Sequence, residues 1–136
     1  MSNKLIEIEG IGPVYAATLQ EKLGITKVTE LLELGASKKG RDEIAEKTGI
    51  SEKLILRWVN MADLFRIKGV GEEFSDLLEA AGVDTIKELR NRVPANLHAK
   101  MLEVNEEKNL VRRTPNLSEV ESWVAQAKEM EPTVTH

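Results

Sequence analysis

The 136-residue chain contains no cysteine, and it has few aromatic residues, two histidines and no long apolar run. Without cysteine it can form no disulfide, thiolate nucleophile or thiolate metal site. The histidines, His98 and His136, stand at no spacing that suggests converging ligands, so we expect no metal. No apolar stretch approaches the roughly 18–20 residues that cross a bilayer, so we expect no membrane contact. The start "MSNKLIEIEG" is unlike a signal peptide and favours a cytoplasmic location.

Signatures of catalysis are missing as well. No strand pattern precedes the glycine pairs, as the phosphate loops of nucleotide-binding enzymes require. Carboxylates are numerous, but they lie on solvated helix faces and no pair stands in an apolar setting. We therefore expect no enzyme activity, no catalytic residue and no cofactor. The formal net charge of −4 argues against a protein that coats nucleic acid, so a polyanion would have to meet a local patch.

The chain does contain a repeated phrase built on paired glycines. "IEGIGPVYAATL", Ile8–Leu19, returns 59 residues later as "IKGVGEEFSDLL", Ile67–Leu78. A second match joins "WVNMA" at Trp58–Ala62 to "WVAQA" at Trp123–Ala127. An internal duplication explains both matches.

Each copy predicts two helices joined by a tight turn. Gly10–Gly12 forms hairpin one and Gly69–Gly71 forms hairpin two, because the torsions of such a turn are easy only without a Cβ. Apolar residues at helical spacing follow each hairpin. Gly24 and Gly82 end these helices as left-handed C-caps. The aromatic residues fall on apolar faces and are expected in the core: Tyr15, Trp58, Phe65, Phe74 and Trp123.

The pattern predicts an all-α protein without a sheet, a compact bundle of short helices with pseudo-twofold symmetry. The first repeat with its helical extension would span residues 1–66 and the second residues 67–131, both sharing one core. Residues 132–136 would form a flexible tail. A capping box of Ser118 and Glu121 would start the last helix, which we expect to cover hairpin one.

The phrase "EGIGPVYAATL" resembles the helix-hairpin-helix motif, with the small residue Ala16 four positions after the second glycine. Two copies resemble a tandem helix-hairpin-helix domain. Most of the chain is similar to a prokaryotic group, the domain of unknown function 4332, in which phrases like "TGISEKLILRWVNMADLFRIKGVGEE" and "NLHAKMLEVNEEKNLVRR" are typical. DNA-binding members of the helix-hairpin-helix class hold a phosphate on the backbone N–H groups of the hairpin. The resemblance thus implies contact with nucleic acid that is independent of base sequence.

The candidate nucleic-acid-binding residues are the two hairpins and the cations that could assist them. They are Gly10, Ile11, Gly12, Lys38, Lys39, Arg41, Lys68, Gly69 and Gly71. The sequence departs from the DNA-binding pattern after each hairpin. Pro13 removes one N–H donor from hairpin one, whereas Glu72 and Glu73 would repel a phosphate from hairpin two. Hairpin one is therefore the better candidate.

Three functions remain open at this point. The leading one is a non-enzymatic binding module that contacts the backbone of DNA or RNA. The alternative is a protein-interaction or scaffolding domain in which the hairpins are only architecture. A lesser alternative is a helix-turn-helix DNA reader over Arg41–Phe65, with Ser51–Trp58 in the major groove. The identity of the partner and the oligomeric state stay undetermined.

Overall fold

The structure is a computed structural model that describes residues 3–135, in which eight α-helices and one short 3₁₀ helix form. The predicted all-α class is confirmed. The chain divides into two compact units: unit 1 comprises Met1–Asp63 with Thr133–His136, and unit 2 comprises Leu64–Pro132. The division falls three residues before the predicted boundary after Arg66. The single shared core and the pseudo-twofold symmetry stay predictions.

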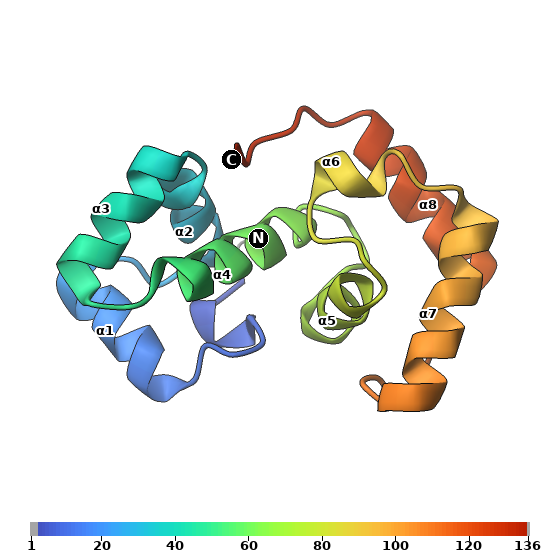
Figure 1. Ribbon diagram of the computed structural model, residues 1–136, viewed down its shortest axis with the longest axis horizontal. Helices are drawn as coiled ribbons and strands as arrows, with labels where there is room; N and C mark the ends of the chain where they lie inside the picture. The colour runs from blue at the N-terminus through green and yellow to red at the C-terminus, as the bar shows by residue number, and fades with distance from the viewer. Residues whose placement is uncertain (1–2, 136) are drawn as a thin grey trace. The chain divides into compact units, whose positions relative to one another are not determined.

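Unit 1 is built from short helices (Figure 1). They are η1 (Leu5–Glu7), α1 (Pro13–Leu23), α2 (Val28–Gly35), α3 (Lys38–Thr48) and α4 (Glu52–Leu64), which runs to the start of unit 2. Helix α3 packs against both α1 and α2, and η1 lies against α1. Gly24 ends α1 with a φ of +71°, and its N–H donates to the carbonyl of Gln20, which confirms the predicted left-handed cap.

The core of unit 1 is aliphatic around a single buried indole. Its fully buried members include Ile8, Leu19, Leu31, Ile55, Trp58 and Val59. They come from the lead-in to hairpin one, from α1, α2 and α4, so each of these elements is held through its apolar face. This burial, rather than the intrinsic propensity of such short helices, stabilises them.

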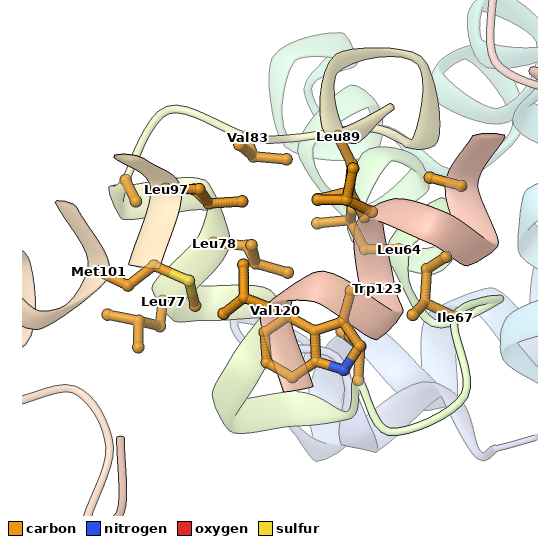
Figure 2. Close-up of a cluster of buried hydrophobic side chains, with 14 of the residues drawn as sticks. Leu64, Ile67, Leu77, Leu78, Val83, Leu89, Leu97, Met101, Val120 and Trp123 are labelled. Carbon is orange, nitrogen blue, oxygen red and sulfur yellow. The ribbon is translucent and has the colours of Figure 1, made fainter. Parts of the chain in front are cut away.

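Unit 2 contains four helices: α5 (Glu72–Ala80), α6 (Ile86–Leu89), α7 (Pro94–Lys108) and α8 (Leu117–Lys128). Helix α7 packs against α5 and α8, and α6 packs against α8. Figure 2 shows Val120 and Trp123 of α8 in the same buried cluster as Leu77 and Leu78 of α5. Gly82 follows α5 with a φ of +95°, and the predicted left-handed cap is present there too.

Helix α8 packs on hairpin two and starts earlier than predicted. Its Trp123 lies beside Phe74, with ring centroids 5.1 Å apart. The expectation that α8 covers hairpin one stays a prediction. The capping box is formed by Asn116 and Glu119, whose side chains accept from each other's backbone N–H at 2.9 and 3.0 Å. The predicted box of Ser118 and Glu121 is therefore two residues too late.

The C-terminal segment also differs from prediction. Val134 is buried, and the N–H of Thr135 donates to the carbonyl of Ala36 at 2.8 Å. Arg41 donates to the carbonyl of Thr135 at 2.7 Å. Residues 133–135 therefore pack on unit 1 rather than forming a flexible tail, and His136 lies outside the described residues.

The two glycines of each hairpin have different roles. Gly10 and Gly69 have φ values of +94° and +98°, which side chains rarely adopt. A Cβ at Gly10 would also lie 3.0 Å from Nη1 of Arg57 and 3.3 Å from Nε1 of Trp58. Gly12, with φ −84°, is extended, and a Cβ there would meet nothing within 4 Å. The fold thus requires the first glycine of hairpin one and leaves the second free.

The same substitution at the two positions should separate these roles. Gly10→Ser should destabilise the protein by roughly 1–3 kcal/mol. A serine there would have to adopt a strained positive φ, and its Cβ would crowd the indole of Trp58. Gly12→Ser should change stability by less than about 0.5 kcal/mol, since serine is a good N-cap for α1. Urea denaturation followed by circular dichroism measures both, and equal effects would contradict the assignment.

The capping box of α8 makes a pH-dependent contribution to stability. The guanidinium of Arg113 and the backbone N–H of Asn116 lower the pKa of Glu119 from 4.5 to about 2. The folded state therefore holds the charged carboxylate more strongly than the unfolded state does. This contribution is complete above pH 4.5 and is lost as the pH falls toward 2. Melting temperatures of wild type and Glu119→Gln should differ at pH 7 and converge near pH 2; a constant difference would refute the mechanism.

Candidate nucleic-acid interface

Hairpin one presents the open N-terminus of an eleven-residue helix. Gly12 is the N-cap of α1, and Pro13 and Val14 follow it, so no carboxylate stands in the first turn. In the described part of the chain, no acceptor is bound to the N–H of Val14 or Tyr15. Val14 itself is 78% exposed, which leaves this end of the helix open to solvent. Free amides and the positive end of the helix dipole converge there, as at many anion sites.

Arg57 of α4 supplies a cation at hairpin one. Its Nη1 donates to the carbonyl of Glu9 at 3.2 Å and lies close to Gly10. This role of Arg57 was not predicted from the sequence, in which Arg57 falls within the candidate recognition helix Ser51–Trp58. The repeat could have indicated that Arg57 lies near a hairpin. Trp58 and Trp123 occupy matching positions in the two copies, and Arg57 directly precedes Trp58.

Two aromatic rings support the same hairpin. Tyr15 and Trp58 meet edge to face, with ring centroids 5.0 Å apart. Trp58 is fully buried, whereas Tyr15, which we expected in the core, is 37% exposed. The indole N–H of Trp58 has no hydrogen-bond partner among residues 3–135 and lies against Gly10. Hairpin one is therefore held by packing on the indole rather than by a hydrogen bond from it.

Hairpin two is built similarly but is electrostatically different. Gln126 of α8 bonds both backbone groups of Lys68, accepting from its N–H at 2.9 Å and donating to its carbonyl at 3.1 Å. Gly69 lies against Nε1 of Trp123, as Gly10 does against Trp58. The first turn of α5 carries Glu72 and Glu73. Negative charge thus stands where an anion would bind, in agreement with the sequence-based preference for hairpin one.

Two of the three predicted cations on α3 are bonded to other groups of unit 1. Lys38 pairs with Glu52 at 3.2 Å and Asp42 at 3.4 Å, and these carboxylates raise its pKa. Arg41 is 2% exposed, and its guanidinium donates to the carbonyls of Gly35 and Ala36 as well as Thr135. Lys39 is exposed. The prediction that Arg41 contacts nucleic acid is therefore wrong, because its guanidinium is buried on backbone carbonyls.

The remaining candidates for chemistry are sparse. In residues 3–135, no group of three or more histidine, aspartate or glutamate side chains is arranged to hold a metal ion. The ring of His98 instead bonds the carbonyl of Pro115 at 2.9 Å. Among the described helices, none has the length and hydropathy that crossing a bilayer demands.

Residues 9–130 match the family described as "Domain of unknown function (DUF4332)". The chain belongs to the DUF4332 family. The match spans both hairpins and all the α-helices, so it agrees with the resemblance seen in the sequence. No solved structure matches the chain. The family description assigns no activity, and the geometry of hairpin one therefore carries the functional argument for this DUF4332 chain.

The structural role of Arg41 can be tested directly. Arg41→Met should destabilise the protein by roughly 2–4 kcal/mol, because buried carbonyls lose a charged donor. Lys39→Met, the same change on an exposed neighbour, should alter stability by less than about 0.5 kcal/mol. Urea denaturation measures both. Equal stability of the two variants would mean that Arg41 is not a structural clamp.

Proposed function

We propose that this DUF4332 chain is a non-enzymatic binding module that contacts the backbone of nucleic acid, DNA foremost, without reading base sequence. The observation that carries the proposal is the open N-terminus of α1. Gly12 is glycine although neither its torsions nor its surroundings require it, since φ is −84° and a Cβ would meet nothing within 4 Å. An external group that approaches the backbone closely accounts for the missing side chain.

A phosphate suits this position chemically. Its oxygens can accept from the N–H groups of Val14 and Tyr15 at the positive end of the helix dipole. Arg57, which already bonds the carbonyl of Glu9, places a guanidinium beside the same turn. These donors recognise a phosphate and no base edge, so binding would be independent of sequence.

The charge of the whole chain sets the expected strength. With a net charge of −4, the protein as a whole repels a polyanion, and binding rests on a few local contacts. Such binding is weak and falls steeply as salt rises.

A protein-interaction or scaffolding role is the second candidate. It is supported by exposed apolar side chains on unit 1, chiefly Val14 at 78% and Ile6 at 48%. In this role the hairpins would be architecture, and Gly12 would be open because a protein surface packs there. Protein–protein contacts commonly bury such side chains at their centre.

The helix-turn-helix alternative has less support. The turn after α3 is present, and Gly49 has a φ of +76° there. The second helix, however, has Ile55 and Trp58 fully buried, and Glu52 at its start is paired with Lys38. A recognition helix needs a free side-chain face for the major groove.

Fluorescence anisotropy with a labelled DNA duplex, a single strand and a structured RNA tests the proposal. Each titration would be run from low to physiological salt. Wild-type protein should bind at low salt and weaken steeply as salt rises. Gly12→Asp should reduce affinity by about tenfold or more, because its carboxylate would occupy the amides that hold the phosphate.

Gly71→Asp is the matched control. It adds the same charge at the corresponding position of hairpin two. The affinity should change less than about twofold, because Glu72 and Glu73 already repel an anion from that hairpin. Aspartate is a favourable N-cap, so both variants should stay folded, which circular dichroism checks. Absence of binding at low salt, or equal loss in both variants, would sink the proposal and favour a protein partner.

A further inference from the structure

Unit 1 contains an open groove with a volume of about 460 Å³, bounded by η1, α1 and the segment before α2. Its apolar surface comes from Leu5, Ile6 and Ala16. Leu5 is buried beneath the groove, whereas Ile6 is 48% exposed. The volume lies within the range of natural small-molecule sites. The groove uses none of the residues that hold hairpin one.

Two lysines stand at the polar side of this groove and face each other across the backbone. Lys4 and Lys27 form an isolated antiparallel bridge. Hydrogen bonds flank the pair on both sides, from the N–H of Leu5 at 3.1 Å and from that of Val28 at 2.8 Å. The pair is therefore of the type without mutual hydrogen bonds, in which opposed side chains approach most closely, with Cα atoms about 4.5 Å apart.

Like charges placed directly opposite each other destabilise a strand pair. Glu7 accepts from the N–H of Lys4 at 2.7 Å and Glu30 from that of Lys27 at 3.0 Å. The backbone N–H groups of Thr26 and Lys27, with a smaller contribution from the charge of Lys27, lower the pKa of Glu30. Among residues 3–135, neither ammonium group has an ion-pair partner within 4.0 Å. An additional anion between the two lysines would lower their mutual repulsion further.

We propose that this groove binds small amphipathic carboxylates. The alkyl or aryl body lies on Leu5, Ile6 and Ala16, and the carboxylate lies between the ammonium groups of Lys4 and Lys27. The juxtaposition of an exposed aliphatic surface and two lysines on directly opposed residues specifies both ends of the ligand. Gln20 of α1 adds an amide at the same groove. This binding does not depend on the proposed function of hairpin one.

Nucleic acid is a poorer fit to the same groove. The lining contains no aromatic ring on which a base could stack. A phosphodiester would satisfy the lysines but leave the aliphatic surface of Ile6 in water. The apolar half of the groove therefore distinguishes a carboxylate with a hydrophobic body from a polyanion.

Decanoate is the probe, added below its critical micelle concentration to ¹⁵N-labelled full-length protein and followed by amide chemical shifts. Decanol and decyltrimethylammonium, which share the alkyl chain, test the requirement for negative charge. Decanoate should bind, shift the amides of Leu5, Ile6 and Ala16 together, and bind at least about tenfold more tightly than either control ligand.

Two double variants complete the experiment. Lys4→Gln with Lys27→Gln should weaken decanoate binding by about tenfold or more. Lys22→Gln with Lys47→Gln removes the same charge from exposed positions outside the groove and should leave the affinity unchanged. Circular dichroism verifies that all variants are folded. Gly12→Asp should also bind decanoate normally, which separates this inference from the nucleic-acid proposal.

Several results would overturn the inference. These are no decanoate binding, shifts that map outside the groove, or equal binding of decyltrimethylammonium. If the Lys4 and Lys27 substitutions weaken binding of DNA but not of decanoate, the lysines belong to a nucleic-acid surface and the groove is not a carboxylate site.

Discussion

In both units the backbone of the first hairpin glycine lies directly on a buried indole, and the following helix is placed by that contact. A Cβ at Gly10 would lie 3.3 Å from Nε1 of Trp58, and one at Gly69 would lie 3.2 Å from Nε1 of Trp123. The close approach is possible because both glycines take positive φ values. In each unit an aromatic side chain in the first turn of the following helix packs on that indole. The ring centroids lie 5.0 Å apart for Tyr15 and Trp58, and 5.1 Å apart for Phe74 and Trp123. Helix α4, which carries Trp58, and helix α8, which carries Trp123, thus fix the hairpins from which α1 and α5 begin.

This shared architecture carries opposite electrostatics at the two hairpins. Hairpin one is tied to α4 by the guanidinium of Arg57 and is followed by uncharged residues, whereas hairpin two is tied to α8 by the neutral amide of Gln126 and is followed by Glu72 and Glu73. Because a helix N-terminus attracts anions, a carboxylate in the first turn neutralises that attraction. The proposed phosphate contact is therefore assigned to hairpin one and not to hairpin two.

Some cations of unit 1 are bonded within the fold, whereas others are exposed to solvent. Arg41 is buried on three backbone carbonyls, and Lys38 is paired with two carboxylates. Lys4 and Lys27, by contrast, are held opposite each other by backbone hydrogen bonds and face a groove with an aliphatic surface. Counting basic residues along the chain cannot distinguish these cases, because the distinction depends on which acceptors surround each side chain.

The sequence by itself determined the all-α class, the helix-ending glycines Gly24 and Gly82 and the difference in charge after the two hairpins. Those features depend on apolar spacing, glycine torsions and charges within one helical turn, which are local in sequence. The tertiary structure decided what is distant: Arg41 is buried because Thr135 returns to it, and α8 covers hairpin two because Trp123 fits beside Phe74 and Gly69. It also showed that the fold needs Gly10 but not Gly12. The two glycines look alike in the motif, but only Gly10 has a positive φ and neighbours that a Cβ would contact.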